Sequence, residues 1–260
     1  MSFLRLSQVS VAFPIFDSND RQLKLRLVAA ATGGLIGNNA TNQVCVQALD
    51  NVTLRFEDGD RVALVGHNGS GKSTLLRVLA GIYEPSSGTL HRQGRVGALL
   101  GMGMGMDPDS TGRENILLSG LYLGLSRAKA RAHMDEIIDF TELGSFIDLP
   151  MRTYSAGMWA RLAFAVSTLI DPEVLILDEG IGAGDAAFIE KANLRLRELR
   201  ERVGIMVLAS HSEELIRLMC DKAVLLDRGR VAAFAGVDEI FALYHKPATS
   251  RQPAKLSAAS

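Results

Sequence analysis

The sequence contains little cysteine, no long apolar run and no excess of charge of either sign. Its 260 residues include two cysteines, Cys45 and Cys220, so there is no disulfide framework and no cysteine cluster for a metal. A reducing cytosol is therefore the expected compartment. Lys and Arg number 28 against 29 Asp and Glu, which gives no global reason to expect nucleic acid or an acidic membrane surface as a partner.

No segment has the character of a signal peptide or a membrane span. Residues 1–11 are too polar and too short for an apolar signal core. The longest uncharged run, residues 27–49, is punctuated by Thr, Asn, Gln and Gly, whereas a spanning helix needs about 20 predominantly apolar residues. We therefore expect no direct membrane span. The composition, 47% hydrophobic and 22% charged, excludes a disordered chain and suits one α/β domain with a small insert.

Apolar strands alternate with helical patterns along the chain. Strands are expected from the first residues to Pro14 and over 44–56, 61–65, 174–177, 205–209 and 223–226. Helices are expected over 72–80, within 112–146, within 154–170, over 186–202 as a charged and exposed helix, and over 237–244. Turns are expected at 57–60 and 85–88, a loop-like insertion at 16–43, a Gly/Met-rich patch at 96–106 and a flexible tail at 246–260. This order predicts a parallel sheet sandwiched by helices and interrupted by a helical subdomain at about 107–170.

The strongest motif is a glycine-rich loop between a strand and a helix. It matches G-x-x-x-x-G-K-[ST] and comprises Gly66, His67, Asn68, Gly69, Ser70, Gly71, Lys72, Ser73 and Thr74. Glycines let the backbone curl around a phosphate, and the loop N–H groups with the helix N-terminus supply positive potential. The motif predicts that Lys72 reaches the β- and γ-phosphates of a nucleotide and that the Ser73 hydroxyl binds Mg²⁺.

A pair of carboxylates follows the apolar strand at 174–177. The carboxyl end of a buried parallel strand lies at the ligand crevice of such a sheet. We expect Asp178 to hold Mg²⁺, and Glu179 to polarise the water that attacks the γ-phosphate. Taken alone, the pair fits a solvated turn equally well; together with the phosphate loop it favours a nucleotide hydrolase.

A third element, Tyr154-Ser155-Ala156-Gly157-Met158, precedes a helix. Here the sequence resembles the ATP-binding subunits of ABC transporters, whose signature usually reads Leu-Ser-Gly-Gly-Gln. The resemblance implies that Ser155, Ala156 and Gly157 contact ATP bound by the other copy of a head-to-tail homodimer. Ser155 is equally suited to cap the helix that follows, and the two roles are compatible.

Two further segments carry the resemblance. Asp185, after Gly180-Ile181-Gly182-Ala183-Gly184, matches the Asp of the family's loop at the dimer interface, and His211 matches its switch histidine, which contacts the γ-phosphate. As an alternative, Asp185 would cap the next helix. The other four histidines show no ligand spacing and are expected at the surface or in loops.

The sequence departs from the family's pattern at two places. The position where members usually have a Gln falls at Gly101 or Met102, and no Gln occurs in this stretch, so a side-chain sensing role there is in doubt. The aromatic residue that stacks on adenine is expected to be Phe13, with Phe16 as the reserve; either is equally suited to a core position.

The resemblance implies an α/β P-loop NTPase fold of RecA-like type, with a parallel-sheet core, an N-terminal antiparallel β region and an inserted α-helical subdomain, in one nucleotide-binding domain over 1–245. It implies an ATPase that uses ATP and Mg²⁺. The insertion at 16–43, the TGRENI segment and YSAGMWARLAF resemble the branch that exports O-antigen, capsule or teichoic-acid chains, in a short form without a C-terminal carbohydrate-binding domain. We expect a homodimer beneath a transmembrane permease, at the cytoplasmic face of the inner membrane, without nucleic acid. The alternatives are an ABC ATPase for another cargo, such as a lipid or an imported solute, and a low-turnover nucleotide sensor.

Overall fold

The computed structural model describes residues 1–14, 36–38, 44–101, 103, 105–178 and 186–246. The chain divides into two compact units, Met1–Gly94 with Gly204–Ser260, and Arg95–Val203. Each unit is described by itself. Among the described residues, no helix combines the length and the apolarity that a bilayer span requires.

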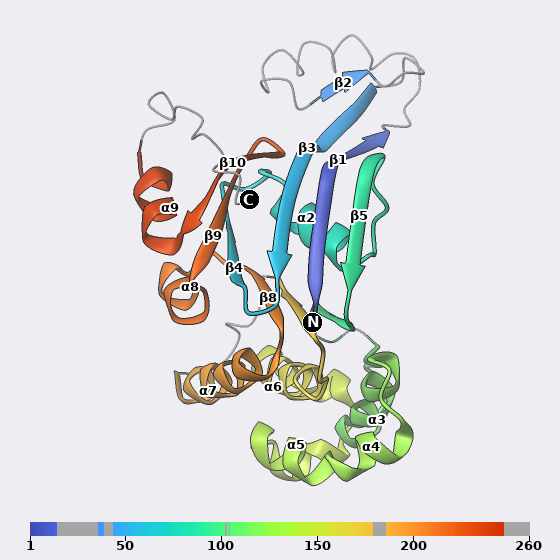
Figure 1. The fold of residues 1–260 in the computed structure, drawn as a ribbon. Helices are drawn as coiled ribbons and strands as arrows, with labels where there is room; N and C mark the ends of the chain where they lie inside the picture. The colour runs from blue at the N-terminus through green and yellow to red at the C-terminus, as the bar shows by residue number, and fades with distance from the viewer. Residues whose placement is uncertain (15–35, 39–43, 102, 104, 179–185, 247–260) are drawn as a thin grey trace. The chain divides into compact units, whose positions relative to one another are not determined.

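The first unit begins with an antiparallel sheet. Its strands lie in the order β2-β3-β1-β5, with bounds Ile36–Asn38, Val44–Glu57, Phe3–Pro14 and Ser87–Gln93. In Figure 1 the two long strands β1 and β3 run side by side, with β5 along the other side of β1. Several residues of β1, including Leu4 and Leu6, are fully buried between more exposed neighbours, and the strand predicted from the first residues to Pro14 is confirmed.

The second sheet of this unit carries the phosphate loop. Strand β4, Arg61–Val65, lies between the parallel strands β8, Ile205–Ala209, and β9, Lys222–Asp227; β9 also pairs with the antiparallel β10, Arg230–Gly236. Helices α2, α8 and α9 span Lys72–Leu79, Glu213–Met219 and Val237–Tyr244. The four apolar residues of β4 after Arg61 are buried, which is typical of a parallel strand covered on both faces.

The other unit consists mainly of helices. Strands β6, Val96–Leu99, and β7, Val174–Leu177, pair in parallel. Helices α3, α4, α5, α6 and α7 span Gly112–Tyr122, Arg127–Ala132, Met134–Thr141, Ala156–Ser167 and Ala186–Arg202, with 3-10 turns at Gly144–Asp148 and Met151–Thr153. A core around Ile116, Ile137 and Leu162 joins several of these helices. Each such side chain contributes about 1.5–3 kcal/mol when it is fully buried.

Several elements differ from the sequence-based expectation. The turn expected at 85–88 is wrong in its second half, because Ser87 already starts β5 and pairs with Ser10. Almost every side chain of β5 is exposed, so this edge strand shows no alternation. The Gly/Met-rich patch begins with β6, and the pattern over 112–146 divides into three helices and a 3-10 turn. Helix α7 has the predicted bounds but also a buried stripe: Phe188, Ala192, Leu196 and Leu199.

Candidate functional site

The phosphate loop joins strand β4 to helix α2. The strand ends at Val65, and the helix begins at Lys72 after Gly71, which has φ 104°. Four α2 side chains, Leu75, Leu76, Val78 and Leu79, are buried, and the helix lies within the predicted range 72–80. Burial of this apolar face holds the helix N-terminus, and therefore the N–H groups of its first turn, at the end of the loop.

The loop requires glycine at different positions for different structural reasons. A Cβ at Gly66 would lie 2.4 Å from the Leu226 carbonyl oxygen, and one at Gly71 would lie 2.7 Å from the Ala48 carbonyl oxygen, so neither position has room for a side chain. At Gly69, with φ 79°, no atom of the described residues lies within 4 Å of that position. The backbone at Gly69 is thus open to an approaching anion, which is the cradle that a phosphate requires.

Lys72 lies over the loop. Its ammonium group donates to the carbonyl oxygens of Gly66, at 2.6 Å, and His67, at 3.3 Å. The Ser70 hydroxyl in the same loop is buried and has no hydrogen-bond partner among the described groups. The Lys72 ammonium group above the loop and the unsatisfied Ser70 hydroxyl within it suit a polyphosphate ligand better than a loop that only connects a strand to a helix.

The turn between β9 and β10 supports the loop. The Gly229 N–H donates to the Ser70 carbonyl oxygen at 2.9 Å, and the Gly229 carbonyl oxygen accepts from Asp50 N–H at 2.8 Å. A Cβ at Gly229, with φ 77°, would lie 2.8 Å from the Ala48 carbonyl oxygen. Sequence reasoning missed this support, since nothing in the residue order links Gly229 to the loop.

Aromatic rings lie at two further places in this unit. Phe13, the predicted adenine-stacking residue, is 38% exposed and packs edge-on against Tyr83, with ring centroids 5.4 Å apart. Tyr83 was not among the predicted site residues. The His67 ring lies 5.0 Å from the ring of Tyr244, the last residue of α9. Because the Phe13 side chain is partly exposed, its ring is available for stacking. The reserve candidate, Phe16, lies outside the described residues.

His211 follows strand β8 at the place that the sequence predicts. It is exposed, and Ser212 behind it caps α8 by accepting the Leu215 N–H at 3.2 Å. The other predicted catalytic residue, Glu179, lies outside the described residues, as do Asp185 and Met102.

Asp178 stands directly after the buried strand β7. Its N–H donates to the carbonyl oxygen of Leu99, the last residue of β6, at 3.1 Å. Its side chain is partly buried. A carboxylate here and a hydroxyl at Ser73 are oxygen donors of the type that Mg²⁺ prefers. No group of three or more potential metal ligands occurs among the described residues.

Ser155 caps helix α6. Its hydroxyl accepts the Met158 N–H at 3.2 Å, so the capping role considered from the sequence is confirmed. Beside it lies a pocket of about 500 Å³, lined by Glu142, Leu143, Phe146, Ser155, Gly157, Met158 and Arg161. Apart from its own helix backbone and chain neighbours, the one described atom within 4 Å of a Cβ placed at Gly157 is the Ser155 hydroxyl oxygen, at 3.9 Å. The helix start therefore presents open backbone and a hydroxyl to an incoming ligand.

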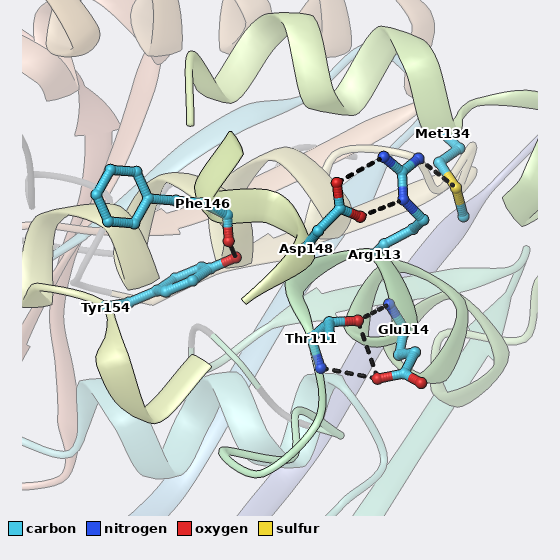
Figure 2. A network of polar contacts seen from close by, with 7 residues as sticks. All are labelled: Thr111, Arg113, Glu114, Met134, Phe146, Asp148 and Tyr154. Atoms are coloured by element: carbon cyan, nitrogen blue, oxygen red, sulfur yellow. Dashed lines mark hydrogen bonds and ion pairs between the residues drawn. The ribbon is translucent and has the colours of Figure 1, made fainter. Parts of the chain in front are cut away.

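Tyr154, in the position where the family usually has Leu, is anchored by its hydroxyl (Figure 2). The hydroxyl donates to the Phe146 carbonyl oxygen at 2.8 Å and also has a hydrogen bond with the Gly112 backbone. A Cβ at Gly112 would lie 2.3 Å from this oxygen, so residue 112 has no room for a side chain. Burial raises the pKa of Tyr154, which widens the alkaline range over which the hydroxyl stays protonated and donates.

The start of α3 lies in the same network. Thr111 and Glu114 form a capping box, and the Thr111 backbone N–H, with its hydroxyl, lowers the pKa of the Glu114 carboxyl. Arg113 pairs with Asp148 at 2.8 Å and lowers the pKa of that carboxyl through a hydrogen bond. The segment that leads into α6 is therefore fastened to the beginning of α3.

Replacing Tyr154 by Phe is expected to lower the free energy of unfolding by about 1 kcal/mol, because two backbone groups lose a partner. Urea unfolding followed by circular dichroism measures this. Tyr122→Phe is the matched control, since that side chain is 61% exposed in the same unit. Equal unfolding midpoints for the two variants would contradict the anchoring role.

Comparison with known families decides the identity of this arrangement. The family model for the ABC transporter matches residues 49–182. The chain belongs to the ABC transporter family. This membership confirms the resemblance that the sequence predicts.

Several curated relatives are named as ATP-binding proteins of export systems. The O-antigen export system ATP-binding protein RfbE of Yersinia enterocolitica is 46% identical over 231 residues, covering 89% of this chain and 97% of that protein. The O-antigen export system ATP-binding protein RfbB of Myxococcus xanthus is also 46% identical, over 77% of this chain, which spans 46% of that protein. The teichoic acids export ATP-binding protein TagH of Lactococcus lactis is 37% identical, over 82% of this chain and 45% of that protein.

Solved structures confirm the fold class of this ABC protein. A dimeric post-hydrolysis ATP-binding cassette bound to ADP and Pi has a TM-score of 0.67 at 20% identity, covering 90% of this chain and 98% of that one. The ATP-binding subunit of another ABC transporter has a TM-score of 0.69 at 22% identity, covering 93% of each chain. The mixed α/β fold with an antiparallel N-terminal sheet is thus as predicted. The domain bounds and the roles of individual site residues remain predictions.

Proposed function

We propose that this protein is the ATP-hydrolysing subunit that powers export of a cell-surface polysaccharide, such as O-antigen, through a separate transmembrane subunit. The phosphate loop carries the ATPase part of this proposal, because its backbone is open at Gly69 and its cation lies above the loop. Support for the cargo comes from relatives at 46% identity that act in O-antigen export.

Each candidate residue has one role in the proposed reaction. Lys72 neutralises charge on the β- and γ-phosphates, while Phe13 stacks on adenine. A water oxygen attacks the γ-phosphorus, and the bond from that phosphorus to the bridging oxygen of ADP breaks. Glu179 accepts the proton of the water, and His211 orients Glu179 and the γ-phosphate. The products are ADP and inorganic phosphate.

The residues present suit a magnesium ion. Ser73 offers an exposed hydroxyl at the start of α2, and Asp178 offers a carboxylate at the end of β7. Bound there, Mg²⁺ would supply positive charge to the phosphate oxygens.

The proposed assembly is a head-to-tail homodimer. Ser155, Ala156 and Gly157 then serve the nucleotide that the partner's Lys72 holds, and Asp185 lies at the dimer interface. The open pocket beside Ser155 supports this part of the proposal, since it leaves the helix start accessible. A transmembrane permease holds the dimer at the cytoplasmic face of the inner membrane.

Mixing two inactive variants tests the shared site. Lys72→Ala removes the phosphate cation, and Ser155→Arg blocks the helix start. In a mixed dimer, one site combines the intact Lys72 of one copy with the intact Ser155 of the other. We expect each variant alone to be inactive, and the mixture to recover up to about a quarter of wild-type hydrolysis, because half the dimers are mixed and each has one intact site. An inactive mixture in which mixed dimers are shown to form would contradict the shared site.

The cargo is tested in the protein's own host. In a strain whose chromosomal gene encodes Lys72→Ala, the polysaccharide should accumulate inside the cell and be absent from the surface. Binding of an antibody against the polysaccharide, before and after the cells are permeabilised, measures both pools. Lys246→Ala, at the end of the described chain, is the control. Normal surface polysaccharide in the Lys72→Ala strain would overturn the assigned cargo and leave the ATPase assignment standing.

A further inference from the structure

The backbone of Gly103 lies against helix α6, the helix that Ser155 caps. It has φ 83°, and a Cβ there would lie 1.7 Å from Cη2 and 2.2 Å from Cζ2 of Trp159. The backbone at residue 103 is thus in direct contact with the edge of the indole ring. Any other residue at 103 would push the indole or the backbone away.

Both sides of this contact lead to candidate site residues of the same unit. Gly103 follows strand β6, whose last residue, Leu99, accepts the hydrogen bond of the Asp178 N–H. Trp159 lies one helical turn after Ser155 and donates its backbone N–H to the Ser155 carbonyl oxygen at 3.0 Å. The Gly103–Trp159 contact is therefore the place where the segment that follows β6 meets the helix that starts after Ser155.

The contact has room to change. A cavity of about 20 Å³, enough for about one water molecule, is lined by Gly101, Gly103, Met106, Ser119 and six neighbouring residues. The Ser119 hydroxyl is 2% exposed and has no hydrogen-bond partner among the described groups. The chain around Gly103 is therefore loosely packed where it lines this cavity, whereas it is in direct contact with the Trp159 indole.

We propose that Trp159 is a positioning residue for hydrolysis, and that its contact with Gly103 couples occupancy of the Asp178 end of β7 to the orientation of Ser155 and Gly157. This inference rests on the proposed function. A shift of the strand end on nucleotide binding moves Gly103, Gly103 moves the indole, and the indole turns the helix start that serves the partner copy. In this chain, backbone and indole thus perform the coupling at a place without a Gln side chain.

Trp159 supplies its own readout, because it is the one tryptophan of the chain. The full chain is titrated with ATP and Mg²⁺ at a concentration where sedimentation shows single copies, so that no partner covers the ring. We expect a saturable change in indole emission with the midpoint of nucleotide binding. No change in emission, in protein that binds ATP, would overturn the coupling.

Gly103→Ala tests the consequence for turnover. We expect kcat to fall about 10- to 100-fold, as a small misplacement of a site residue does, while the affinity of single copies for ATP stays within about twofold. Gly105→Ala is the matched control, since residue 105 also has a positive φ, 77°, but lies against Tyr122. A wild-type kcat in Gly103→Ala would overturn the proposal.

Trp159→Phe provides a second test, which does not depend on whether Gly103→Ala folds correctly. Its smaller ring withdraws from the backbone, so kcat should fall while ATP affinity is retained, and Gly103→Ala should cost less in this background than in the wild type. Equal costs in both backgrounds would overturn the coupling. Wild-type protein that does not hydrolyse ATP would instead refute the proposed function, so the two failures are distinguishable.

Discussion

Replacement of Glu179 by Gln is expected to lower the kcat of ATP hydrolysis about 100- to 10,000-fold, the contribution of a positioned general base. Gln keeps the size of the side chain and its hydrogen bonding but does not accept the proton of the attacking water. ATP binding should persist, because the phosphate loop is untouched. The protein should therefore accumulate as an ATP-bound dimer, measured by sedimentation with and without ATP and by phosphate release.

A control at the other end of the same strand separates this effect from general damage. Glu173 precedes β7 and accepts the Arg95 N–H at 2.7 Å, a bond that the amide oxygen of Gln can also accept. Glu173→Gln should hydrolyse ATP at the wild-type rate. If Glu179→Gln also hydrolysed ATP at the wild-type rate, Glu179 would not be the base, and the proposed mechanism would lose its proton acceptor.

The elements that the sequence predicts well are those with a strong apolar pattern. Strands β4, β7 and β8 are short runs of buried apolar residues, and the buried face of α2 is visible in the spacing of its leucines. By contrast, β5 is stabilised by backbone pairing with β1 and exposes nearly all its side chains, so its residues carry no pattern. Strand β6 contains Gly97, where a Cβ would lie 2.5 Å from Ile170 Cδ1 and 2.9 Å from Pro172 Cβ, and these tertiary contacts explain the glycine.

In the candidate site, too, some residues are predictable from the sequence pattern and others only from tertiary contacts. Motif spacing predicts the phosphate loop and Asp178 as site residues, since each directly follows a short buried apolar strand. Contacts between distant segments are invisible to spacing: Gly229 supports the loop from the β9–β10 turn, and Gly103 meets Trp159 from a different segment. Their glycines are visible in the sequence, but the groups that exclude a side chain are not.

Lys72→Ala should abolish most of the activity by a different route. The ammonium group now donates to the Gly66 and His67 carbonyl oxygens, so it is already held over the loop where phosphate charge would lie. Removing a preorganised donor of this kind lowers kcat by about 100- to 1,000-fold. Because the same cation also neutralises the bound nucleotide, ATP affinity should fall too, which is the opposite of the expectation for Glu179→Gln.

Isothermal titration with a non-hydrolysable ATP analogue and a phosphate-release assay measure the two effects of Lys72→Ala. Lys222→Ala is the control, because Lys222 pairs with Asp60 at 2.7 Å, at the opposite end of β9 from the Arg228–Gly229 turn. Its loss should leave affinity and kcat unchanged, and sensitivity of the reaction to salt should be the same as in the wild type. Unchanged ATP affinity in Lys72→Ala would mean that the open backbone at Gly69 and the N-terminus of α2 hold the phosphates without the cation, and the ammonium group would then act in the transition state alone.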